Sequence, residues 1–189
     1  EQSGHIAAVG YEMYCQLLEE AVDGLQNRER PKIADVLVNI GVSGWIPRAY
    51  IPSDRRRLEA YRRAATVQTP EAVAKLREDL VSAYGEPPEA MQRMLDLAEV
   101  RAMTGLLGAR EMRVAGADLI IRCRATAVFH EAFRGMQGSV RDVGAAGADG
   151  LREVYVRPPQ AFLQPASLMA VLRKRLGPLA KASAEQAAA

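Results

Sequence analysis

The stretch REMRVAGADLIIRCR, residues 110–124, decides the fold class because the hydrophobic period of the chain changes there. Upstream of it, apolar residues recur every three or four positions, as in helices; within it they approach the alternation of a strand. Leu119, Ile121 and Cys123 point to one side of such a strand, and the neighbouring arginines point to the other. Residues 115–117 supply a turn, so the stretch predicts a β-hairpin.

Short elements continue downstream of this hairpin. Residues 127–135 have a helical pattern, and residues 138–143 and 151–157 predict a second hairpin across the glycine-rich turn GAAGADG. The last predicted helix runs from Pro165 to Leu176. The alanine-rich residues 179–189 are expected to form a flexible tail.

Upstream of the hairpin, one strand and three helices are predicted in succession. Valine and isoleucine alternate strictly in residues 36–42, which favours a half-buried strand. Ser53 is the expected N-cap of the first helix, and Thr69-Pro70 is a typical start for the second. Caps, prolines and glycines together bound these three helices at residues 53–67, 70–84 and 88–107.

A further amphipathic helix is predicted near the start of the chain, over residues 9–26, followed by a polar linker. Strands and helices are partly segregated along the chain, so we predict an α+β fold. It consists of a connector helix followed by a compact domain of several helices packed on a small, mainly antiparallel sheet. We divide the chain into residues 1–8, a connector and linker at 9–33, a domain at 34–178 and a tail at 179–189.

Composition excludes several classes of protein. Of the 189 residues, 49% are apolar and 25% are charged, which is typical of a globular domain, and the net charge is only +2. Cys15 and Cys123 are expected to be reduced core residues, and neither His5 nor His130 has a carboxylate or thiol at ligand spacing, so no metal site is predicted. No apolar run is long enough to span a membrane, and the start has neither the basic n-region nor the cleavage site of a signal peptide. We expect a cytoplasmic location.

The chain contains none of the motifs that mark nucleotide binding, acyl transfer or metalloprotease chemistry, so we predict no catalytic residues. Its strongest charge feature is DRRRLEAYRR, residues 54–63. We expect Leu58, Tyr61 and Ala65 to face inward, and the arginines to face solvent. These arginines are Arg55, Arg56, Arg57, Arg62 and Arg63.

Three interpretations of this run remain open. The first is a solvated amphipathic helix whose arginine stems cover apolar side chains. The second is contact with the backbone of DNA or RNA, where each neutralised phosphate adds a salt-dependent increment of affinity. The third is docking on an acidic protein surface, because arginine pairs with carboxylates in a bidentate manner.

Three stretches, in this order, resemble the C-terminal end of the bacterial transcription-repair coupling factors (Mfd). They are EQSGHIAAVGYEMYCQLLEEAV at residues 1–22, IPRAYIPSDRRRLEAYRRAA at 46–65 and LREDLVSAYGEPPEAMQRMLDLAEVR at 76–101. The third departs from the family at Ala83-Tyr84-Gly85, where an Arg-Phe-Gly ending is usual. The likeness covers residues 1–110; beyond it, only the pattern of elements agrees.

The resemblance implies that the chain comes from an ATP-driven translocase of double-stranded DNA, which displaces stalled RNA polymerase and recruits UvrA. ATP and Mg²⁺ would be bound by the motor upstream, and no cofactor is expected in this chain. Gln2, Ser3 and Gly4 would close the translocation motif shared with the RecG helicase, with Gln2 as the loop residue that couples the motor to DNA.

The resemblance further implies that the domain from residue 34 onward is a regulatory module. It would pack on a UvrB-like N-terminal region of the same protein and hide the surface that binds UvrA. Four exposed residues, Arg55, Arg56, Arg62 and Arg63, are the candidate interaction surface, and the protein is expected to be a monomer. Two alternatives are a nucleic-acid-binding module that holds DNA behind the motor and a small stand-alone enzyme.

Overall fold

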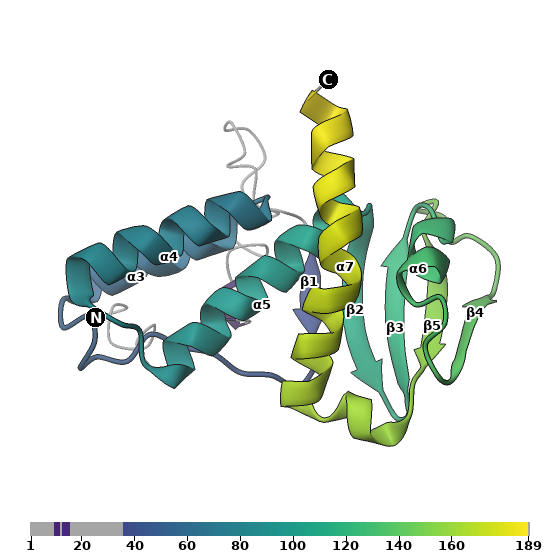
Figure 1. Ribbon diagram of the computed structural model, residues 1–189, viewed down its shortest axis with the longest axis horizontal. Helices are drawn as coiled ribbons and strands as arrows, with labels where there is room; N and C mark the ends of the chain where they lie inside the picture. Colours follow the sequence, from purple (N-terminus) through teal and green to yellow (C-terminus); the bar gives the residue numbers. More distant parts are fainter. Residues whose placement is uncertain (1–9, 12, 16–35, 189) are drawn as a thin grey trace. The chain divides into compact units, whose positions relative to one another are not determined.

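The computed structural model describes residues 10, 11, 13–15 and 36–188, and its elements are labelled in Figure 1. The strands are β1 Leu37–Asn39, β2 Ala109–Ala115, β3 Asp118–Cys123, β4 Ser139–Val143 and β5 Arg152–Arg157. The helices are α3 Asp54–Thr66, α4 Pro70–Tyr84, α5 Glu89–Leu106, α6 Ala127–Ala132, η1 Gln160–Leu163 and α7 Pro165–Ala188. The described residues divide into a helical unit, 10, 11 and 13–15 with 43–99, and a sheet unit, 36–42 with 100–188.

The five strands form one mixed sheet in the order β1-β2-β3-β5-β4. Only β1 and β2 are parallel, and the other three pairs are antiparallel. The predicted α+β class with a mainly antiparallel sheet is therefore confirmed, and so are both hairpins. The order shows in addition that β5 lies between β3 and β4, which the sequence could not indicate.

The first strand is shorter than predicted. The ladder with β2 covers only Leu37–Asn39, although the alternate residues from Val36 to Val42 are all buried as expected. Gly41 has a φ of 71°, a left-handed conformation that interrupts an extended strand. The alternation therefore marked a buried segment correctly and overstated the length of its hydrogen-bonded part.

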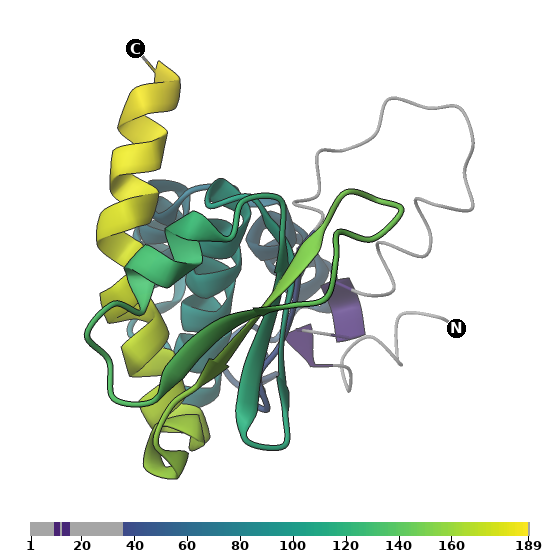
Figure 2. The same ribbon diagram turned by 90° about the vertical axis from the view of Figure 1, so that its right-hand side faces the viewer.

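The core of the sheet unit lies on one face of the sheet, the face that α6 and α7 cover (Figure 2). Met112, Ile121 and Val154 stand side by side in register on neighbouring strands and have no exposed surface. From α7, Leu172, Leu176 and Ala180 are equally buried. This apolar layer is what holds the strands together, because three contiguous strands bury their inner side chains at once.

Helix α7 continues to Ala188, whereas the sequence predicted an end at Leu176. The prediction stopped at Gly177-Pro178, since proline inside a helix removes a hydrogen bond and clashes with the preceding turn. Two features offset that cost. Ala180 is completely buried, and the Ser183 hydroxyl donates a hydrogen bond to the Leu106 carbonyl at 3.2 Å. The alanines that follow are the strongest helix formers, so residues 179–188 are helix rather than a frayed tail.

Polar side chains on the sheet are paired across strands. Asp118, at the start of β3, is buried and accepts hydrogen bonds from Arg157 of β5 at 3.0 Å (Nε to Oδ1) and 2.5 Å (Nη2 to Oδ2). Arg141 of β4 lies 3.6 Å from the same carboxylate. These guanidinium groups, Arg157 first, hold the pKa of Asp118 below its ordinary value despite the opposing effect of burial. One carboxylate thus links the last three strands of the sheet.

This pairing predicts a pH dependence of stability. Because the pKa of Asp118 is lower in the folded state, the contribution of the pair is complete above the unfolded pKa of about 4 and is lost as the pH falls through the folded value. We therefore expect Asp118→Asn to lower the urea midpoint clearly at pH 7 and by a smaller amount at pH 3, below the unfolded pKa. An equal loss at both pH values would show that the ionised carboxylate contributes nothing.

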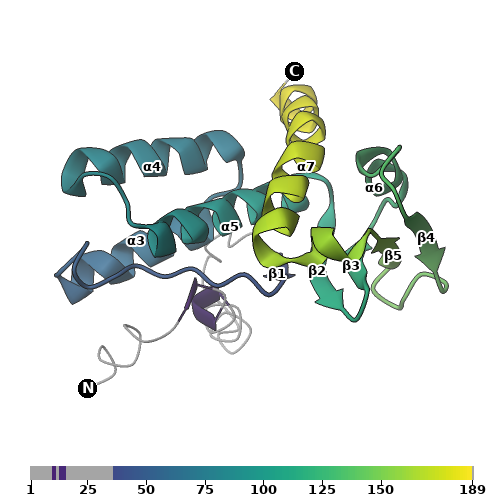
Figure 3. The same cartoon turned by 60° about the horizontal axis from the view of Figure 1, so that its bottom comes forward.

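The helical unit contains α3, α4 and the first part of α5, and α3 lies beside α4 (Figure 3). The predicted caps are confirmed. The Ser53 hydroxyl accepts a hydrogen bond from the Arg56 N–H at 3.4 Å, and the Thr69 hydroxyl accepts one from the Ala72 N–H at 3.2 Å. Gly85 ends α4, with its N–H bonded to the Val81 carbonyl at 2.8 Å. These local bonds fix where α3 and α4 begin and end.

Candidate interaction surface on helix α3

Helix α3 is held in place by the contacts of three tyrosines. The Tyr61 hydroxyl, buried within the unit, accepts a hydrogen bond from the Ile46 N–H at 2.8 Å. The Tyr14 ring stacks on the Tyr61 ring with 5.4 Å between centroids, and the Tyr11 hydroxyl donates to the Ala64 carbonyl at 2.9 Å. Burial raises the pKa of Tyr61, so its hydroxyl stays protonated and anchors the loop before the helix. The buried side of α3 is thus fixed to the loop before the helix through Tyr61, and to Tyr11 and Tyr14 near the start of the chain.

The buried side of α3 is rotated from the predicted one. Tyr61 and Ala65 face inward as expected, but Arg57 is buried at 3% exposure and Leu58 is 39% exposed. The Arg57 guanidinium donates from Nη1 to the carbonyls of Ile51 and Pro52 at 2.7 and 3.0 Å, and its Nη2 pairs with Asp54. The loop before α3 leaves carbonyl groups without a backbone donor, and a buried arginine satisfies them.

The four predicted surface residues, Arg55, Arg56, Arg62 and Arg63, are all exposed on α3. They differ in their neighbours. Arg62 donates to Glu59 at 3.0 Å on the same helix, and Arg63 pairs with Asp79 of α4. Neither Arg55 nor Arg56 forms an ion pair with any residue that the structure describes. Among the described residues, Arg62 and Arg63 therefore have ion-pair partners, and Arg55 and Arg56 have none.

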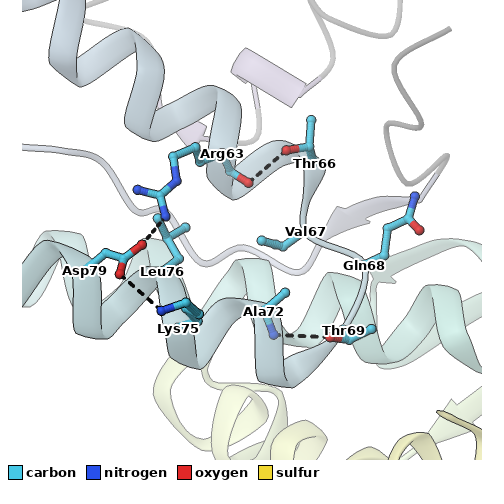
Figure 4. Close-up of a pocket in the computed structure, with 9 residues that line it drawn as sticks. All are labelled: Arg63, Thr66, Val67, Gln68, Thr69, Ala72, Lys75, Leu76 and Asp79. Carbon is cyan, nitrogen blue, oxygen red and sulfur yellow. Dashed lines mark hydrogen bonds and ion pairs between the residues drawn. The ribbon is translucent and has the colours of Figure 1, made fainter.

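An open groove of about 470 Å³ lies between the end of α3 and the first half of α4 (Figure 4). Arg63 and Lys75 approach Asp79 from two sides, with Lys75 Nζ at 3.7 Å. Arg63 and then Lys75 keep the pKa of Asp79 below its ordinary value. Both cations are thus engaged with this carboxylate, and the ion pair between Arg63 and Asp79 links α3 to α4.

A second polar cluster joins α6 to the edge strand β4. His130 Nε2 lies 2.6 Å from Asp142 Oδ1, and the Thr126 hydroxyl donates to Asp142 Oδ2 at 3.0 Å. The spacing of residues along the chain does not indicate this contact, because β4 returns beside α6 only in the folded sheet. Nearby Cys123 is fully buried, and burial raises its pKa to about 11, so its thiol is not ionised at neutral pH.

The remaining predicted site residues form the predicted end of a translocation motif. They are Gln2, Ser3 and Gly4, and they lie outside the described residues. Within the part of the chain that the structure describes, His, Cys, Asp and Glu side chains nowhere gather in groups of three or more that could hold a metal ion. Its helices also include none that is long and apolar enough to cross a membrane.

The fold and the surface together define an α+β domain with a mixed five-stranded sheet and a helix, α3, that exposes four arginines. Residues 40–130 of this domain match the family model described as "TRCF domain". That range holds α3, α4, α5 and the first hairpin, and so includes all four candidate arginines.

Curated relatives agree with this match. The chain is 34% identical over 131 residues to the transcription-repair-coupling factor of Mycobacterium tuberculosis, a match that covers 64% of this chain and 11% of the relative. It is 30% identical over 117 residues to the transcription-repair-coupling factor of Escherichia coli, covering 59% of this chain and 10% of the relative. The chain thus spans about a tenth of the length of the curated relatives it matches.

The fold is similar to a solved structure described as the C-terminal domain of transcription-repair coupling factor. The TM-score is 0.58 at 13% identity, and the match covers 78% of this chain and 94% of that one. At this identity the likeness concerns the fold alone. The matches fall on a C-terminal TRCF domain and support the predicted resemblance over the matched part of the chain.

Proposed function

We propose that this chain is the C-terminal part of a transcription-repair coupling factor and acts there as a regulatory module. The observation that carries the proposal is the match of residues 40–130 to the TRCF domain. The parent protein would be a cytoplasmic, monomeric, ATP- and Mg²⁺-dependent DNA translocase that displaces stalled RNA polymerase and recruits nucleotide excision repair. The chain itself would bind neither ATP nor Mg²⁺.

In this proposal the module docks on the UvrB-like N-terminal region of the same protein and covers the surface that binds UvrA. Such masking needs a complementary surface and a modest coupling free energy, typically about 1–3 kcal/mol. The exposed arginines of α3 supply a charged surface of the required kind. Engagement of the parent protein with polymerase and DNA would then release the module and expose the UvrA site.

A competition experiment tests this function. We expect the 189-residue chain, added in excess to the UvrB-like region of the same factor, to weaken its affinity for UvrA by about 5- to 150-fold. Biolayer interferometry with UvrA immobilised would measure the change, with serum albumin at equal concentration as the control. UvrA binding that stays the same at saturating chain would contradict the masking role.

The same preparation tests the nucleic-acid-binding alternative. Titration of a fluorescent duplex with the chain at several salt concentrations would reveal a phosphate-directed module, because its affinity falls steeply as salt rises. The regulatory proposal expects weak binding or none.

A further inference from the structure

The charge of the chain is divided unequally between its two units. The described part of the helical unit carries nine Lys and Arg against nine Asp and Glu, so its net charge is zero despite the arginine run on α3. The described part of the sheet unit carries thirteen Lys and Arg against seven Asp and Glu, a net charge of +6. The long-range attraction of this chain for an anionic partner therefore comes from the sheet unit.

Four arginines of the strands are neutralised by carboxylates within the sheet unit. These arginines are Arg113, Arg122, Arg141 and Arg157, and their partners are Glu111, Asp118, Asp149 and Glu153. The excess positive charge of the unit therefore lies on other cations. Three of them, Arg110, Arg124 and Arg152, are exposed arginines at the ends of strands.

These three arginines lie at the same end of the sheet. Cys123, the last residue of β3, is in register with Ala109 of β2 on one side and with Arg152 of β5 on the other. Arg110 follows Ala109 in the chain, and Arg124 follows Cys123. Because neighbouring strands are about 4.8 Å apart, the row across β2, β3 and β5 is roughly 10 Å long. We call these three residues the basic end of the sheet.

The guanidinium groups of Arg124 and Arg152 form no ion pair with any residue that the structure describes. Arg152 acts on Asp142, but that carboxylate already accepts a hydrogen bond from Thr126 at 3.0 Å and contacts His130 at 2.6 Å. His130 is the main cause of the lowered pKa of Asp142, and the charge of Arg152 is the weakest. Both arginines can therefore bind an external anion without losing an internal partner.

We propose that the basic end of the sheet binds the phosphate backbone of duplex DNA. Successive phosphates of one strand are separated by 3.4 Å along the duplex axis, so a row roughly 10 Å long matches about three of them. Arginine suits this contact, since its planar guanidinium binds a phosphate through two parallel hydrogen bonds. The proposal goes beyond the regulatory role and adds a weak contact with DNA that is independent of base sequence.

The aromatic side chains of the sheet unit favour a duplex over a single strand. Proteins that bind single strands stack the bases on exposed aromatic rings. Among the described residues of this unit, the one exposed Phe, Tyr or Trp is Phe162. It belongs to η1, which follows the far end of β5, whereas Arg152 is the first residue of that strand. The basic end therefore offers charge without a stacking surface, as contact with a duplex backbone requires.

Fluorescence anisotropy of a short labelled duplex, titrated with the 189-residue chain at several salt concentrations, tests the proposal. We expect a Kd of about 10⁻⁴–10⁻⁶ M at physiological salt, and a slope of about −3 for the logarithm of the binding constant against that of salt. Arg124→Glu with Arg152→Glu should weaken binding by about tenfold or more and bring the slope to about −1. Arg124→Lys with Arg152→Lys keeps both charges and should retain most of the affinity.

A matched variant on α3 separates position from net charge. Arg55→Glu with Arg56→Glu makes the same charge change in the helical unit and should weaken duplex binding by no more than about threefold. If this variant loses as much affinity as Arg124→Glu with Arg152→Glu, the basic end is not the contact and the inference is overturned. Melting temperatures of both variants show whether each one is folded.

Three further outcomes would also contradict the proposal. The first is a duplex that stays unbound even at low salt, in which case the competition with UvrA still decides the regulatory role. The second is a single strand of equal length that binds more tightly than the duplex, which would show that bases rather than backbone are recognised. The third is polyglutamate of equal charge that displaces the duplex as well as unlabelled duplex does, which would make an acidic protein the better partner.

Discussion

Replacing Gly44 with alanine is expected to lower the free energy of unfolding by about 3 kcal/mol or more. A Cβ at this position would overlap the backbone N and Cα of Met94 and lie 2.9 Å from the carbonyl carbon of Arg93. Both belong to α5, whose backbone cannot shift without disturbing its hydrogen bonds. Gly44 also accepts a hydrogen bond from the Tyr11 N–H at 3.0 Å, so a displacement would break that contact as well.

Gly116 provides the matched control for this prediction. It has a φ of 61° in the turn between β2 and β3, and a Cβ there would meet nothing within 4 Å. Alanine at position 116 should therefore cost only the strain of a left-handed conformation, about 1–2 kcal/mol. Chemical denaturation of both variants separates close packing from backbone conformation. A Gly44→Ala variant no less stable than Gly116→Ala would contradict the close approach of the two backbones.

Local signals in the sequence predicted the helices well. Ser53, Thr69 and Gly85 act through bonds to residues three or four positions away, so their effect is visible in a short window of sequence. The two hairpins were predicted for the same reason. The end of α7 was not, because burial of Ala180 by distant residues overrides the local effect of Pro178.

The candidate surface could be predicted only in part. The exposure of Arg55, Arg56, Arg62 and Arg63 follows from helical periodicity, but their division into paired and unpaired residues depends on Asp79, which belongs to another helix. The His130–Asp142 contact depends in the same way on the return of β4 beside α6. Such contacts are fixed by the order of elements in space, which periodicity does not contain.

Arg57 was predicted to be solvent-exposed but is buried. Replacing it is therefore expected to give the second large loss of stability. Arg57→Ala should destabilise the chain by about 3 kcal/mol, because it leaves the Ile51 carbonyl buried without its side-chain donor and removes the partner of Asp54. Arg55→Ala, two residues earlier and at an exposed position, should change stability by no more than ~0.5 kcal/mol. Urea denaturation of the two variants measures the difference.

A conservative variant of the same residue shows what its geometry contributes. Lysine at position 57 keeps the charge near Asp54 but cannot direct two parallel N–H groups, so Arg57→Lys should recover only part of the loss. The loop between Trp45 and Asp54 would then be held at fewer points, and amide hydrogen exchange should rise there before it rises in α5. If Arg57→Ala proves as stable as Arg55→Ala, water satisfies the loop carbonyls, and the stabilising role given to Arg57 is wrong.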